Sequence, residues 1–268
     1  MRRLVTIFLL FFSCGSYVIN RGNVIRISGS DTMRLLVSKW AAEFREANPG
    51  IDIRIKSEGT ANGIRALISG KADICAASRP LRAAEVRTIA EKYNKIGMST
   101  LVAKDALSIY INPENPLRNL TLDQLEKIFQ GEVTNWSAVG GLDEPILVLT
   151  RSSDSGTYLY FREHILGGDS FTDAAVEKDR TAEIVATVLE NRNAIGYGGL
   201  AYGEKIIHCY VNGVAPTIEN VKNDSYPIIR YLYLFTIEKP QGIVKQFIDW
   251  VLKDGQKIVD DVGYIPLW

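Results

Sequence analysis

The feature that most constrains the fold is a polar turn that recurs four times, each time directly after an apolar, strand-like run. The four turns are Ser28-Gly29-Ser30-Asp31-Thr32, Gly59-Thr60-Ala61-Asn62-Gly63, Ser78-Arg79-Pro80 and Arg151-Ser152-Ser153-Asp154-Ser155-Gly156-Thr157. A helix-type apolar pattern follows each turn. Repeated strand–turn–helix units favour parallel βαβ packing, which gathers such turns at the carboxyl edge of a sheet. The sequence therefore predicts an α/β protein with its polar turns brought together.

Apolar periodicity also predicts the remaining elements. Strands are expected at 24–30, 51–56, 72–77, 101–111, 145–149, 194–199 and 226–236, and helices at 33–44, 64–69, 83–93, 121–129, 158–166, 181–191 and 242–252. Thr121 and Gln124 have the spacing of a capping box. Strands and helices alternate along most of the chain, as expected for the α/β class.

Composition argues against several classes of function. The chain has 268 residues with 31 basic and 31 acidic side chains, so it lacks the positive excess typical of nucleic-acid binding. Cys14, Cys75 and Cys209 lie far apart, and with only two histidines present no metal site or cofactor is expected. Cys75 and Cys209 lie within apolar runs, where we expect buried free thiols.

The N-terminus has the form of a secretory signal. Arg2-Arg3 precede the apolar run 4–12, and small residues follow in Ser13-Cys14-Gly15-Ser16. The apolar run is too short to span a bilayer. Residues 1–22 are therefore predicted to be a signal peptide and the mature chain to be exported. Two interpretations stay open: Cys14 as the acceptor of a bacterial lipoprotein signal, or ordinary cleavage near Ser16.

The four turns carry the chemistry of a small-anion site. A turn that opens a helix presents backbone N–H groups and hydroxyls beside the positive end of the helix dipole. Arg151 adds a planar fork of donors that suits an oxyanion. Each turn alone is explained by N-capping, and it is the joint occurrence that favours a binding site. Ser155 has no base nearby and no nucleophile elbow or phosphate loop is present, so an enzyme is not expected.

Motifs along nearly the whole mature chain resemble one family. They are the four turns, Ala72-Asp73-Ile74, Ile128-Phe129-Gln130-Gly131, Thr134-Asn135-Trp136, Ile195-Gly196-Tyr197, Pro216-Thr217-Ile218-Glu219-Asn220-Val221, Tyr226-Pro227 and Gly263-Tyr264-Ile265-Pro266-Leu267. In this order they resemble the phosphate-binding proteins of bacterial phosphate ABC transporters. The resemblance implies a periplasmic-binding-protein type II fold, with two α/β lobes joined by a hinge. Lobe one would take 23–103 and 204–268, and lobe two 104–203.

The resemblance also implies a ligand, partners and a location. Inorganic phosphate would lie in the interlobe cleft of a monomer that delivers it to ABC permease subunits. The protein would be periplasmic or on the cell surface, with no nucleic acid partner and membrane contact only through a lipid anchor. Carried over residue by residue, the phosphate donors would be Ser30, Thr32, Thr60, Ser78, Arg151, Ser155, Gly156 and Thr157.

One departure from the family concerns the acceptor of the phosphate proton. Some members carry an acid directly after the third-turn serine, where this chain has Arg79. Asp31 and Asp154 are the candidate replacements, and we prefer Asp31 because it neighbours two donors; its alternative role is a plain N-cap. Arg79 is expected either to bind phosphate or to pair with an acid such as Asp31.

Three other functions remain open at the level of sequence. The same fold could bind sulfate, molybdate or a phosphorylated small molecule. It could also serve a phosphate-sensing or adhesion protein. An exported hydrolase is the third alternative, although no catalytic base or metal cluster is visible.

Overall fold

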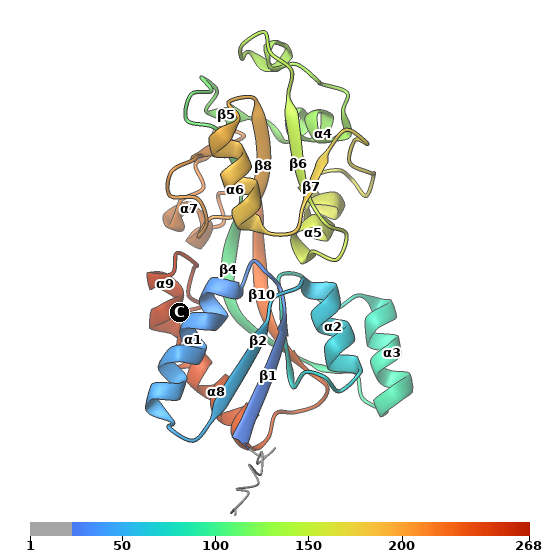
Figure 1. Cartoon of the computed structure of the whole chain (residues 1–268), viewed down its shortest axis with the longest axis vertical. Helices are drawn as coiled ribbons and strands as arrows, with labels where there is room; N and C mark the ends of the chain where they lie inside the picture. The colour runs from blue at the N-terminus through green and yellow to red at the C-terminus, as the bar shows by residue number, and fades with distance from the viewer. Residues whose placement is uncertain (1–22) are drawn as a thin grey trace, which may run out of the picture.

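A computed structural model of the chain describes residues 23–268, which form two lobes stacked along the long axis of the molecule (Figure 1). Residues 1–22, which carry the predicted signal peptide and Cys14, lie outside the described part. The first lobe is built from β1 (Val24–Gly29), α1 (Arg34–Ala47), β2 (Asp52–Lys56), α2 (Thr60–Ile68), β3 (Ile74–Ala77), α3 (Ala83–Tyr93), β10 (Ile229–Thr236), α8 (Gly242–Leu252) and α9 (Gln256–Asp261).

The sheet of the first lobe is mixed. Strand β1 is parallel to β2 and β3, whereas β10 is antiparallel to β3 and to β4 (Met98–Ile111). Apolar residues of α1, α8 and α9 pack on one face of this sheet, and those of α2 pack on the other beside Cys75 and Phe235. The predicted βαβ packing is thus confirmed for the first three strands, whose carboxyl ends carry three of the polar turns.

The second lobe contains shorter strands. Its elements are β5 (Asn119–Leu120), α4 (Leu122–Gln130), a 3-10 helix (Trp136–Val139), β6 (Leu147–Arg151), α5 (Gly156–His164), β7 (Val176–Lys178), α6 (Thr181–Glu190), β8 (Ala194–Gly199), β9 (Ile207–Val211) and α7 (Ile218–Lys222). Strand β6 is parallel to β7 and β8, so the turn after β6 lies at the edge of the sheet where all three strands end. The predicted capping box is present: Thr121 Oγ1 accepts from Gln124 N at 3.1 Å.

Strand β4 belongs to both lobes. Its residues from Met98 to Ala106 pair with β10, and those from Leu107 to Ile111 pair with β8 and β9. Figure 1 shows β4 and β10 passing between the lobes, where they form the hinge. The two-lobe α/β architecture predicted from the sequence is the one observed.

The packing near β9 differs from the expected lobe boundary. The sequence expectation places residues 204–228 in lobe one, whereas β9 pairs with β4 and β5. Cys209 and Val221 lie in the same apolar cluster as Leu125. Apolar periodicity marks a strand but does not show with which strand it pairs. We propose that residues 207–228 belong to the second lobe and that the chain re-enters the first lobe through β10.

Two helices begin earlier in the chain than their apolar pattern does. Helix α2 starts at Thr60 and α5 at Gly156, each before its first periodic apolar residue. Their first turns are polar because they face the other lobe and not the core. Strand β7 and helices α7 and α9 were not predicted, since they are too short to show a period.

Three findings concern the described residues as a whole. Cys75 and Cys209 are buried free thiols, as expected, and burial raises the pKa of Cys209 to about 12. Within residues 23–268, no helix has the length and apolar character required to cross a bilayer. The same residues contain no cluster of three or more metal-ligating side chains.

Candidate functional site

The three turns of the first lobe meet through their hydroxyl groups. Ser30 Oγ donates to Ser78 Oγ at 3.0 Å, and Thr60 Oγ1 lies 3.3 Å from the same oxygen. All three side chains are buried. They come from the ends of β1 and β3 and from the start of α2, as parallel packing of these strands requires. The cluster therefore presents small neutral groups that can donate or accept.

The fourth turn closes on this cluster from the second lobe. Ser155 caps α5, with its Oγ accepting from Thr157 N at 3.2 Å and Tyr158 N at 3.4 Å. Thr157 Oγ1 lies 2.8 Å from Thr32 Oγ1 of the first lobe. The two hydroxyls are buried, so the contact joins the lobes away from solvent. Ser155 thus acts as an N-cap, while its own proton stays available for donation.

Glycine is required at position 156 because the lobes approach so closely there. A Cβ atom on Gly156 would lie 2.4 Å from Thr60 Oγ1 and 2.5 Å from Ser78 Oγ. A similar approach occurs beside it, where Ala61 N donates to the Asp154 carbonyl at 3.1 Å. The first turns of α2 and α5 therefore converge, and both direct backbone N–H groups and positive dipole ends at one place.

Arg151 lies at the end of β6 with its side chain only 2% exposed. Nη1 donates to Thr181 Oγ1 at 2.7 Å and Nη2 to the Asp179 carbonyl at 2.8 Å. Burial lowers the pKa of Arg151, and the nearby Asp31 carboxylate opposes that shift. Its Nε has no hydrogen-bond partner within residues 23–268. The guanidinium is thus held in place and still has a donor to offer.

Asp31 is the acid at the centre of the interlobe contact. Its Oδ2 accepts from Thr181 N at 3.0 Å and lies 3.5 Å from Arg151 Nη1. Its Oδ1 has no hydrogen-bond partner in the described chain, and the nearest cation is Arg34 Nε at 3.5 Å. The alternative role as a plain N-cap is wrong, because α1 is capped by Met33 without any side-chain bond. Asp31 retains a buried oxygen able to accept a proton.

Asp154 and Arg79 have other partners. The Asp154 carboxylate bonds to Arg65 Nη2 at 3.0 Å and Asn62 Nδ2 at 3.3 Å, and its side chain is 44% exposed. Arg79 donates two hydrogen bonds to Glu85, of 2.9 and 2.7 Å. It therefore pairs with an acid, which was one of its two expected roles, but the acid is Glu85 and not Asp31. Both residues lie beside the hydroxyl cluster, with their charges directed elsewhere.

Sequence reasoning missed several residues that hold the site. The Tyr202 hydroxyl donates to the Asp31 carbonyl at 2.9 Å, and the Tyr264 hydroxyl donates to the Thr32 carbonyl. Thr181 joins Arg151 to Asp31, as described above. No local motif marks these residues. Arg230 was missed as well, although a lone arginine within the apolar strand-like run 226–236 was a usable signal.

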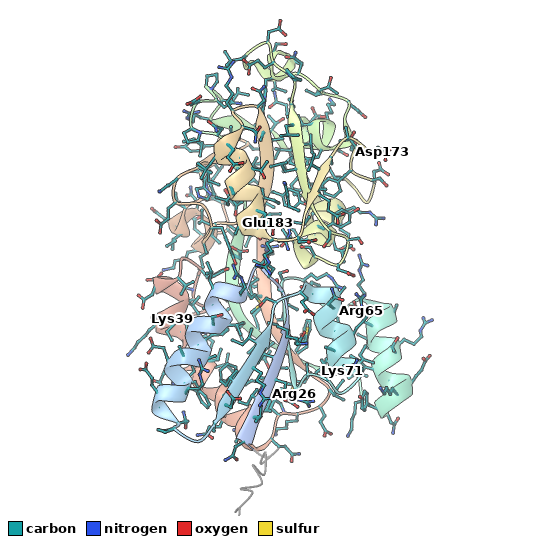
Figure 2. All side chains as sticks on the ribbon, viewed as in Figure 1. Arg26, Lys39, Arg65, Lys71, Asp173 and Glu183 are labelled. Atoms are coloured by element: carbon teal, nitrogen blue, oxygen red, sulfur yellow. The ribbon has the colours of Figure 1, made fainter. Side chains whose placement is uncertain are left out.

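A surface hollow of about 520 Å³ lies elsewhere, on the outer side of the first lobe between β1, β2 and α2. Figure 2 labels Arg26, Arg65 and Lys71 on this side. Its arginines are already neutralised: Arg26 pairs with Asp73, Arg54 with Asp52 and Arg65 with Asp154. The hollow therefore offers less unpaired positive charge than its composition suggests, and we place the candidate site between the lobes.

Comparison with known proteins agrees with this fold. A family model described as a PBP superfamily domain matches residues 19–254. The phosphate-binding protein PstS of Pseudomonas aeruginosa is 31% identical, over 92% of this chain and 83% of that protein. PstS of Bacillus subtilis is also 31% identical, over 91% of this chain and 80% of its own length. The chain belongs to the PstS family of phosphate-binding proteins.

Solved structures extend the match to three dimensions. A phosphate ABC transporter substrate-binding protein from Clostridium perfringens, solved with bound phosphate, has a TM-score of 0.86 and 31% identity. The match covers 92% of this chain and all of that one. A phosphate transport receptor from Vibrio cholerae has a TM-score of 0.75 and 27% identity, over 90% of this chain and 99% of its own. The PstS family and the two-lobe fold predicted from the sequence are thus confirmed.

Proposed function

We propose that this protein is an exported solute-binding protein that captures inorganic phosphate between its lobes and delivers it to an ABC permease. One observation carries the proposal: buried donors of both lobes converge where Thr32 meets Thr157 and Gly156 meets Thr60. A ligand held by both sets stabilises the closed arrangement over an open one, and a membrane partner can distinguish the two.

The binding set that we propose follows the sequence expectation closely. From the first lobe it takes Ser30, Asp31, Thr32, Thr60 and Ser78, and from the second lobe Arg151, Ser155, Gly156 and Thr157. Hydrogen bonds to a charged group contribute about 1.5–3 kcal/mol each. A handful can offset the desolvation of an oxyanion and still leave micromolar affinity, about −8 kcal/mol. Arg79 is proposed as a support for the third turn through Glu85, and not as a ligand contact.

Asp31 gives the site a means to distinguish phosphate from sulfate. Hydrogen phosphate carries a proton that a carboxylate can accept, whereas sulfate carries none at neutral pH. The Oδ1 of Asp31, which accepts no hydrogen bond within residues 23–268, would face the lone pairs of a sulfate oxygen, and this contact is strongly unfavourable. The proposed ligand is therefore the hydrogen-bearing anion.

The remaining parts of the proposal concern partners, location and turnover. We infer that the protein acts as a monomer, that permease subunits read its closed form, and that it works in the periplasm or at the cell surface. We also infer that it performs no catalysis: His208 Nδ1 lies 2.8 Å from Ser108 Oγ, yet that serine is fully buried between strands and cannot reach a substrate.

Titration calorimetry on purified, phosphate-stripped protein tests the proposal. We expect micromolar or tighter binding of phosphate and at least hundredfold weaker binding of sulfate and molybdate. Stronger binding of either competing anion would assign the site to that ligand. If protein that unfolds cooperatively gives no heat of binding with any anion, the interlobe site is not an anion-binding site. A phosphate ester incubated with the protein should release no phosphate.

A further inference from the structure

A second buried arginine reaches the site from the hinge. Arg230 of β10 donates from Nη1 to Thr157 Oγ1 at 2.8 Å. Its Nε and Nη2 donate to Asp105 Oδ2 at 2.8 and 2.7 Å. The side chains of Arg230 and Asp105 are 1% and 0% exposed. A charged pair this deeply buried is costly to desolvate, so its position beside a binding residue calls for an explanation.

The pair lies close to the point where β4 changes its pairing partner from β10 to β8. Arg230 and Asp105 are register partners on β10 and β4. Only two residues further along β4, Leu107 already pairs with Gly199 of β8 in the second lobe. The Arg230 side chain thus connects the two hinge strands to the first turn of α5. A movement of one lobe about this point must move or break the contact with Thr157.

Asp105 allows a second guanidinium to lie near Arg151. Burial is the main cause that lowers the pKa of Arg151, and the charge of Arg230 lowers it slightly further. The carboxylate of Asp105 offsets this repulsion at close range. Burial raises the pKa of Asp105, and Arg230 opposes that rise by favouring the ionised form. The pair therefore adds a fixed donor to the site with little change in its net charge.

The contact favours donation by the Thr157 hydroxyl, although its second lone pair can still accept. A threonine hydroxyl has one proton to give and two lone pairs, whereas a guanidinium can only donate. Arg230 Nη1 takes one of those lone pairs and polarises the O–H bond, which makes the hydroxyl a better donor. Its proton is then free for Thr32 Oγ1, 2.8 Å away, or for an anion oxygen at the same place.

We propose that Arg230 is a positioning residue for the anion site. Held by Asp105, it presents the Thr157 hydroxyl as a donor to the phosphate and ties that donor to the hinge strands. The inference rests on the proposed phosphate-binding function and deepens it, because it makes one ligand contact depend on the arrangement of β4 and β10.

A double-mutant cycle tests the proposal. Asp105→Leu and Arg230→Met are made together, so that neither charge is left buried alone, and Thr157→Val removes the hydroxyl. We expect the Asp105→Leu, Arg230→Met pair to weaken phosphate binding about tenfold, and Thr157→Val to do the same. With all three substitutions the dissociation constant should rise by no more than about twentyfold over that of the parent protein. Independent effects that multiply to about a hundredfold would overturn the proposal. So would full phosphate affinity in the Asp105→Leu, Arg230→Met protein.

A matched control and a second variant keep the result interpretable. Arg192→Met removes an exposed arginine of the second lobe that pairs with Glu144, and phosphate affinity should not change. Arg230→Lys keeps a charge and a donor, and should bind phosphate within about threefold of the parent. A loss of tenfold or more in a folded Arg230→Lys protein contradicts the proposal even where the triple variant does not fold. Failure of the unmodified protein to bind phosphate counts against the proposed function, whereas an additive cycle counts against Arg230 alone.

Discussion

The two lobes contribute to the site in different ways. The first lobe presents hydroxyls that bond to one another, Ser30 to Ser78 and Thr60 to Ser78, while its arginine at position 79 is paired with Glu85. The second lobe also presents two hydroxyls, Ser155 and Thr157, and adds groups that can only donate: the Arg151 guanidinium and the backbone N–H groups at the start of α5. The first lobe thus contributes hydroxyls and the Asp31 carboxylate, whereas the second lobe adds the Arg151 guanidinium, whose Nε has no hydrogen-bond partner within residues 23–268. We infer that the second lobe supplies most of the affinity and that the first supplies closure and, through Asp31, selectivity.

The largest effect should come from the second-lobe charge. Arg151→Ala removes a buried guanidinium that holds Thr181 and lies 3.5 Å from Asp31. We expect phosphate binding to weaken at least a hundredfold, because a charge-assisted donor is lost and Asp31 loses its counter-charge. Calorimetry measures the dissociation constant, with Arg192→Ala as the control. An unchanged constant would remove Arg151 from the site and reverse the division of roles between the lobes.

The first lobe should control selectivity more than affinity. Asp31→Asn turns the unpartnered carboxylate oxygen into a group that is neutral and able to donate. We expect the phosphate-to-sulfate affinity ratio to fall about thirtyfold, mostly through stronger sulfate binding. The matched control is Asp154→Asn, since that carboxylate is already bonded to Arg65 and Asn62. A larger shift for Asp154→Asn than for Asp31→Asn would exchange the two assignments.

Closure of the lobes should depend on the absence of a Cβ atom at Gly156. In Gly156→Ala the new methyl group would lie within 2.5 Å of two first-lobe hydroxyls. We expect about tenfold weaker phosphate binding and little change in the unfolding temperature, because each lobe keeps its own core. Small-angle scattering should show a more open molecule at saturating phosphate. The control is Gly50→Ala, where no atom lies within 4 Å of the added carbon.

The smallest effects should come from ion pairs at the rim. Arg65 bonds Asp154 at 3.0 Å and Arg82 bonds Glu163 at 2.6 Å, each joining a first-lobe arginine to a second-lobe acid. All four side chains are more than 40% exposed, so each pair is worth about 0.2–1 kcal/mol. Replacing both arginines by Met should weaken phosphate binding two- to fivefold at low salt. The difference should shrink by 0.5 M salt; a loss that persists there would mean that these arginines act by packing.

Much of this site could be predicted from local sequence, because its donors lie in turns that follow strands. Thr60, Ser78 and Gly156 are recognisable for that reason, and parallel packing brings them together without further information. Arg230 and Asp105 lie within strands, and their pairing depends on a register between segments 125 residues apart. The only local signs were Arg230, the one charge in the run 226–236, and Asp105, which follows Lys104 in the run 101–111. Asp31 was found, but its partner Thr181 belongs to the other lobe and has no motif.

The place of β9 in the sheet could not be predicted for a related physical reason. Periodicity shows that β9 is a strand-like run but does not show which strand it pairs with. The turn after β8 could lead into either lobe, and the pairing of Cys209 with Ile109 is what decides. Pairing choices of this kind depend on the whole sheet, and a single sequence carries little information about them.

The shared strand β4 has a consequence for the order in which the chain can assemble. The sheet of the first lobe is incomplete until β10 inserts between β3 and β4, and the Trp40 indole donates to the carbonyl of Gly255. Almost the entire polypeptide must therefore emerge before the earliest helix finds its final partner. Such late closure slows folding and leaves apolar surface exposed in the meantime. The delay is a property of the strand order itself, and it suits the export that we propose, because a chain that crosses a membrane before folding has to remain unfolded until then.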